Sequence, residues 1–164
     1  MRFWQCFFFL LATGALGFFV GRLIPKKWLH PEKGIFRCFS FEKGGKLYEK
    51  IGIRKWHKKV PDMSRILPFM MPAKKLTGDY QQRLPDMLLE TCVAELTHGL
   101  LCLVGLYCLR LWPGAGGMII YLLYIVFFNL PYIVIQRYNR PRLIKLQKKL
   151  LEIRDQIDKK GVVV

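Results

Sequence analysis

The stretch FWQCFFFLLATGALGFFVGRL, residues 3–23, decides the class of fold to which this chain belongs. Gln5 and Thr13 are its main polar interruptions, and as a helix it is long enough to cross a hydrocarbon core of about 30 Å. A cleaved signal peptide is the alternative, with a weak cleavage-like site just after Thr13. We favour an uncleaved membrane anchor, because the apolar run continues through residues 18–20 and Arg2 is the only charge before it.

Two further apolar segments predict a hairpin of membrane-spanning helices. A helix over residues 86–112 begins after Pro85, and its apolar part, residues 93–112, is the second span. Residues 118–135 form the third span, in which Asn129 and Pro131 predict a kink. The uncharged run PGAGG at 113–117 predicts a tight turn, so spans two and three are antiparallel neighbours. The predicted fold is a single all-α integral membrane domain over residues 1–164, with about three transmembrane helices and interfacial amphipathic helices.

The basic residues predict how the chain lies in the membrane. The net charge is +16, and 25 of the 27 Lys and Arg residues lie in residues 22–89 and 137–164. The positive-inside rule then places both basic segments in the cytoplasm and the N-terminus outside a cell membrane that the chain crosses several times.

The segments between and after the spans are predicted to lie at the membrane surface. Within the basic interfacial segment 24–85, residues 42–59 predict an amphipathic helix, and the apolar residues 66–71 predict a re-entrant or interfacial turn. Residues 137–160 predict a basic amphipathic C-terminal helix. The apolar spans favour anionic lipid over nucleic acid as the partner of this charge.

Polar side chains where the second span enters the membrane are candidates for catalysis. Glu90, Glu95 and His98 share one face of a helix that turns about 100° per residue. Glu95 and His98 are three residues apart, close enough to pair, and a carboxylate beside an imidazole makes a general base for a hydroxyl proton. The alternative is a polar helix entrance whose side chains reach the headgroups. The depth of His98 favours a catalytic site, since polar groups at this depth are costly.

Two groups of residues are candidates for substrate binding. The hairpin returns the end of the third span to the depth of His98, which brings Asn129 and residues 136–140 close to it. Arg side chains there suit phosphates and carboxylates. The candidates in this group are Gln136, Arg137, Asn139 and Arg140, and a second group that could grip donor phosphates consists of Arg54, Lys55, Lys58 and Lys59. The alternatives are a positive-inside anchor for the first group and a lipid-facing basic helix for the second.

Familiar catalytic signatures are absent from the sequence. It contains no GxSxG, Walker or HExxH motif. Glu95 and His98 form an ExxH pair, but there is no second such pair for a di-iron bundle, so no metal site is expected.

Three runs of sequence resemble the glycosyl-4,4'-diaponeurosporenoate acyltransferases. They are ETCVAELTH at 90–98, RKWHKKVPD at 54–62 and, above all, NLPYIVIQRYNRPRL at 129–143. The resemblance extends from about residue 39, where FSFE fits its start, to residue 146. It implies a membrane-bound enzyme that moves a fatty acyl group onto a hydroxyl of a sugar attached to a carotenoid, late in staphyloxanthin synthesis. The residues that match its motif positions are Glu90, Glu95, His98, Gln136, Arg137, Asn139 and Arg140.

The chain is therefore expected to be an O-acyltransferase that acts on a glycosylated lipid or carotenoid. His98 would be the general base, oriented by Glu95, with Glu90 as a second polar partner. Arg137, or an amide of Gln136 or Asn139, would stabilise the oxyanion. The expected partners are the lipid bilayer, an acyl thioester donor such as acyl-CoA as co-substrate, and the glycosylated acceptor, with no cofactor and no nucleic acid.

Two other readings of the chain stay open at this point. One is a non-enzymatic small membrane subunit or scaffold that binds anionic lipid. The other is a transporter or lipid-handling protein, which with three spans and no internal repeat would need to oligomerise, for example as a homo-oligomer.

Overall fold

The computed structural model describes residues 1–61 and 80–159, and every regular element within those ranges is a helix. Three helical stretches are long and apolar enough to cross a membrane: Arg2–Leu23, Gln82–Leu111 and Ala115–Lys159. The predicted all-α class with three membrane-crossing helices is thus confirmed. The turn predicted at residues 66–71 lies outside the described residues.

The chain divides into two compact units. Unit 1 comprises Met1–His30 and Cys92–Gln136, and unit 2 comprises Pro31–Thr91 and Arg137–Val164. The long helices α5 (Tyr80–Gly105) and α8 (Leu130–Lys159) contribute residues to both units.

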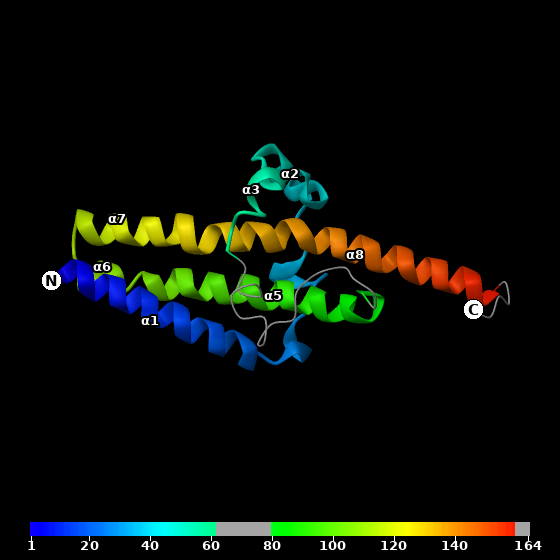
Figure 1. The fold of residues 1–164 in the computed structure, drawn as a ribbon, viewed down its shortest axis with the longest axis horizontal. Coiled ribbons are helices and arrows are strands. Elements are labelled where there is room, and N and C mark those ends of the chain that lie inside the picture. Colours follow the sequence, from blue (N-terminus) through cyan, green and yellow to red (C-terminus); the bar gives the residue numbers. More distant parts are fainter. Residues whose placement is uncertain (62–79, 160–164) are drawn as a thin grey trace. The chain divides into compact units, whose positions relative to one another are not determined.

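Unit 1 is built from apolar helices packed along one another. Helix α1 (Arg2–Leu23) lies beside α6 (Cys108–Leu111) and α7 (Ala115–Leu123) (Figure 1). The core between them contains Cys6, Leu10, Cys108 and Tyr124. Large apolar side chains of α1 such as Phe8 and Leu16 are more than half exposed, as expected where a helix faces lipid instead of water.

The turn of the predicted hairpin is shorter than the sequence indicated. Helix α6 ends at Leu111 and α7 begins at Ala115, so the last part of the PGAGG run is helical. Gly114 closes the turn at a φ of 100°. Gly117 allows the start of α7 to pass against the end of α6, because a Cβ there would lie 2.1 Å from the Trp112 carbonyl oxygen.

The second predicted helix, residues 86–112, is not continuous. Helix α5 ends at Gly105, and α6 begins at Cys108 after a tight turn in which the Leu106 amide bonds the Leu103 carbonyl. Glycine destabilises a helix interior, and here it also makes room for Tyr124, since a Cβ on Gly105 would lie 3.1 Å from that ring.

The interruption predicted in the third span is present as a change of helix type. Residues Tyr124–Asn129 form a π-helix, η4, which ends two residues before Pro131. Proline lacks an amide proton and so favours a local change in the hydrogen-bond pattern at this point. Helix α8 continues through Pro141 to Lys159, so the predicted third span and the predicted C-terminal helix over residues 137–160 belong to one helical stretch.

In unit 2, the amphipathic helix predicted over residues 42–59 is wrong. The chain forms three short pieces instead, η3 (Ser40–Gly45), α2 (Lys46–Lys50) and α3 (Ile53–Trp56). Gly45 and Gly52 adopt φ angles of 94° and 70°, outside the range of a right-handed α-helix, and they directly precede α2 and α3. The glycines therefore outweigh the apolar periodicity.

Candidate functional site

His98 is held by groups of unit 1. It is half-buried on α5, and its Nδ1 lies 3.1 Å from Oδ1 of Asn129. Its ring stacks on Tyr132, with centroids 4.5 Å apart and planes 6° apart. Asn129 is 1% exposed, and its amide Nδ2 donates to the Tyr124 carbonyl at 3.2 Å. The predicted approach of Asn129 to His98 is confirmed.

Nδ1 of His98 contacts Asn129. The sequence had suggested Glu95 as its partner. Glu90 and Glu95 are both half-buried on α5, Glu90 in unit 2 and Glu95 in unit 1. Although Glu95 lies three residues before His98, the imidazole is directed to η4. The roles of Glu90 and Glu95 in catalysis stay predictions.

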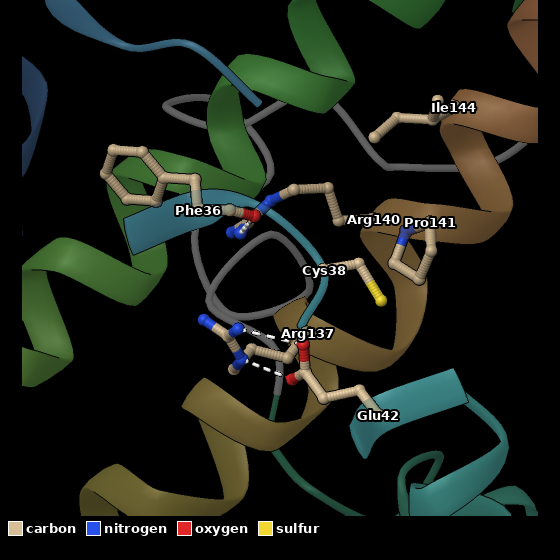
Figure 2. Close-up of a pocket in the computed structure, with 7 residues that line it drawn as sticks. All are labelled: Phe36, Cys38, Glu42, Arg137, Arg140, Pro141 and Ile144. Carbon is tan, nitrogen blue, oxygen red and sulfur yellow. Dashed lines mark hydrogen bonds and ion pairs between the residues drawn. The ribbon is translucent and has the colours of Figure 1, made fainter. Parts of the chain in front are cut away.

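A buried ion pair joins η3 and α8 within unit 2. Arg137 on α8 donates from Nε to Oε1 of Glu42 at 2.6 Å and from Nη2 to Oε2 at 2.9 Å (Figure 2). Glu42 is 1% exposed. The guanidinium also donates to the carbonyls of Ile35 and Arg37, at 3.0 and 3.2 Å, and lies over the Phe39 ring. Such a two-pronged pair is the strongest geometry between these groups.

The Glu42 carboxylate accepts hydrogen bonds from two further groups. The Tyr48 hydroxyl donates to Oε1, and the Phe39 amide donates to Oε2 at 2.6 Å. Burial alone would raise the pKa of Glu42, but the hydrogen bonds from Arg137, Tyr48 and Phe39 outweigh it and hold the pKa below its ordinary value. Burial and the nearby Glu42 raise the pKa of Tyr48, which stays a donor.

This lowered pKa predicts that unit 2 is sensitive to acid. A carboxyl whose pKa is lower in the folded state contributes stability above its unfolded pKa, near 4.5, and loses it as the pH falls through the folded value. We expect the unfolding midpoint of the wild-type protein to fall from pH 5 to pH 3 more steeply than that of Glu42→Gln. Thermal unfolding in detergent across this range measures it, and equal slopes for the two proteins would contradict the pKa assignment.

Arg140, on the next turn of α8, connects α8 to Phe36 and to Thr91 on α5. It is 2% exposed and donates to Oγ1 and the carbonyl of Thr91, at 2.9 and 3.0 Å. It also donates to the Phe36 carbonyl at 2.8 Å. A small pocket lies beside it, lined by Phe36, Cys38, Glu42, Arg137, Arg140, Pro141 and Ile144 (Figure 2).

The remaining predicted binding residues are spread over both units. Gln136, in unit 1, is buried, and Asn139, in unit 2, is half-buried. Arg54 donates to Glu49 at 2.7 Å, and Glu49 also pairs with Arg142. Arg54 and Lys55 on α3, and Lys58 and Lys59 after it, are all exposed. Since Arg137 and Arg140 donate to protein groups, the geometry favours a structural role for both, and their substrate contacts stay predictions.

Sequence reasoning missed Glu42 and Thr91 as members of this network. Glu42 lies in the FSFE run, three residues after Phe39, which is the spacing of an N-terminal helix cap. That spacing could have drawn attention to Glu42. Its partner Arg137 is 95 residues away in sequence, and Thr91 acts partly through its backbone carbonyl, which no side-chain pattern reveals.

The fold and these clusters define an α-helical membrane protein with a half-buried histidine in unit 1 and an arginine-centred polar network in unit 2. The chain belongs to the glycosyl-4,4'-diaponeurosporenoate acyltransferase family, which matches residues 25–149, and it is therefore an acyltransferase. It is similar to the glycosyl-4,4'-diaponeurosporenoate acyltransferases of Staphylococcus aureus strains N315, bovine RF122 / ET3-1 and USA300. Each is 31% identical over 134 residues, which cover 80% of this chain and 79% of the relative. No solved structure matches the chain. The resemblance seen in the sequence is confirmed.

Proposed function

We propose that this acyltransferase moves a fatty acyl group from an acyl thioester, such as acyl-CoA, onto a sugar hydroxyl of a glycosylated lipid or carotenoid. The name of the relatives supports this acceptor class, since it describes acylation of a glycosylated carotenoid acid. The observation that carries the proposal is His98, a half-buried imidazole whose Nδ1 is engaged by Asn129. The hydrogen bond of this ring to the described part of the chain is made through Nδ1, and we assign the acceptor hydroxyl to the other ring nitrogen, Nε2.

The transfer follows from a general base at this position. Nε2 of His98 takes the proton of the sugar hydroxyl as the hydroxyl oxygen attacks the thioester carbonyl carbon. The new C–O bond gives a tetrahedral intermediate, which collapses by breaking the C–S bond. The thiolate leaves and takes the proton from Nε2, so the base is restored. The buried amide of Gln136, which lies in unit 1 with His98, suits the developing oxyanion.

The reaction is proposed to take place at the cytoplasmic face of the cell membrane. Two segments, residues 22–89 and 137–164, contain 25 of the 27 Lys and Arg residues, and a chain with three spans has both segments on the same side. The positive-inside rule makes that side the cytoplasm, so the N-terminus lies outside. The exposed cations Arg54, Lys55, Lys58 and Lys59 would attract donor phosphates there. The acyl chain would lie against apolar surfaces of the membrane-crossing helices.

The acceptor class is tested with purified protein in lipid vesicles supplied with acyl-CoA. We compare a glycosylated lipid with the same lipid lacking its sugar and detect products by mass spectrometry. The expected product is heavier than the acceptor by one acyl chain and forms only when the sugar is present. Equal acylation of both lipids would overturn the sugar hydroxyl as acceptor. No transfer to either, with binding to anionic vesicles intact, would favour a scaffold that binds lipid.

A further inference from the structure

We infer that Asn129 is a positioning residue that fixes His98 in the tautomer with its proton on Nδ1. The Nε2 lone pair is thereby left available for an acceptor hydroxyl. The catalytic consequence rests on the proposed function, whereas the tautomer itself is a property of the protein that can be measured without turnover.

The two hydrogen bonds of the Asn129 amide fix its orientation. One end of this amide lies 3.2 Å from the Tyr124 carbonyl oxygen, and the other lies 3.1 Å from His98 Nδ1. A carbonyl oxygen only accepts hydrogen bonds, so the amide NH₂ must face Tyr124. The reverse orientation would place two acceptor oxygens against each other in a site where Asn129 is 1% exposed. The amide oxygen therefore faces the histidine.

The orientation of this amide in turn fixes the position of the proton on His98. The amide oxygen of Asn129 can only accept, so Nδ1 of His98 must carry the hydrogen. In a neutral imidazole the other ring nitrogen, Nε2, then holds the lone pair. Tyr132 keeps the ring in this orientation, since the two rings are stacked with planes 6° apart.

The π-helix η4 provides the geometry for this arrangement. Asn129 is the last residue of η4 and Tyr124 is the first, so the amide reaches back five residues to a carbonyl of its own helix. π-Helical turns occur frequently at functional sites. The amide is thus anchored within η4, and its oxygen is presented to α5.

An amide suits this position better than a carboxylate. At membrane depth an ionised side chain is costly, while a neutral amide can select the tautomer without adding a charge. A carboxylate would also select this tautomer, because it accepts the same hydrogen bond from Nδ1, but it would lack the donor that the amide gives the Tyr124 carbonyl. The inference therefore distinguishes Asn129→Asp, which keeps an acceptor, from Asn129→Leu, which removes it.

The tautomer is tested by nitrogen NMR of ¹⁵N-histidine-labelled protein, at a pH where the imidazole is neutral. The chain has three histidines, and comparison with His98→Gln identifies the signals of His98. We expect wild type and Asn129→Asp to carry the proton on Nδ1, and Asn129→Leu to shift the population toward the Nε2–H form. A wild-type protein with its proton on Nε2, or an Asn129→Leu protein with an unchanged tautomer, would overturn the inference.

Activity measurements separate this inference from the proposed function. With acyl-CoA and a glycosylated lipid, Asn129→Leu should lower kcat roughly 10- to 100-fold. Activity falls by this factor when metal-binding histidines lose the hydrogen-bond partner that orients their ring. The KM of Asn129→Leu should change little, and Asn129→Asp should recover only part of kcat, because it keeps the acceptor for Nδ1 but loses the donor to the Tyr124 carbonyl. If wild type has the Nδ1–H tautomer but no transferase activity, the proposed function fails and the tautomer stands. An active wild type with the Nε2–H form overturns the inference alone.

Discussion

Arg137→Ala is expected to destabilise unit 2 by about 3–5 kcal/mol, the usual cost of removing one partner from a buried ion pair. Glu42 would keep its charge at 1% exposure with its strongest donor lost. The carbonyls of Ile35 and Arg37 would lose the same guanidinium. Hydrogen–deuterium exchange over residues 35–56, in detergent, measures the effect as faster opening of this segment.

A second substitution separates the loss of the pair from the loss of packing. Arg137→Met combined with Glu42→Gln removes both charges but keeps an acceptor for Tyr48 and the Phe39 amide. This double variant should recover much of the stability lost in Arg137→Ala, since the cost lies mainly in the unpaired charge.

An exposed ion pair provides the control for the same experiment. Lys148 pairs with Glu32, and both side chains are more than half exposed. Lys148→Ala should therefore change stability by no more than about 0.5 kcal/mol. If Arg137→Ala exchanged no faster than Lys148→Ala, the Glu42 pair would not be what holds unit 2 together.

The membrane-crossing helices could be predicted because the physical requirement for them is local and strong. A hydrocarbon core demands about 20 consecutive apolar residues, and this requirement leaves a signal in any short window of sequence. The helix over residues 42–59 failed for an equally local reason, since Gly45 and Gly52 adopt positive φ and end the short helices around them. The backbone conformation of these glycines therefore overrides the apolar periodicity of the segment.

The candidate site was predictable only as far as the hairpin determines it. Antiparallel neighbours bring Asn129 to the depth of His98, and the structure places them 3.1 Å apart. The side chain that hydrogen-bonds the imidazole is determined by the rotamer of His98. The spacing along the helix is equally compatible with Glu95 as that partner. The Glu42–Arg137 pair joins residues 95 positions apart across irregular chain, where no periodic pattern applies.

His98→Ala is expected to lower kcat by about 10²- to 10⁴-fold, the contribution typical of a general base, with little change in KM. The measurement is acyl transfer from acyl-CoA to a glycosylated lipid in vesicles, followed by mass spectrometry. His30→Ala is the matched control, because His30 is exposed and lies outside the contacts of His98. It should keep wild-type activity, and a folded His98→Ala protein with full activity would contradict the base assignment.

Glu95→Gln then decides between the two accounts of how the base is oriented. If Asn129 alone holds Nδ1 of His98, as the 3.1 Å contact indicates, Glu95→Gln should retain kcat within a few-fold of wild type. The carboxylate–imidazole pair suggested by the sequence requires a loss close to that of His98→Ala, because the two groups would act as one unit. A large loss in Glu95→Gln with normal activity in Asn129→Leu would mean that His98 turns to Glu95 during the reaction.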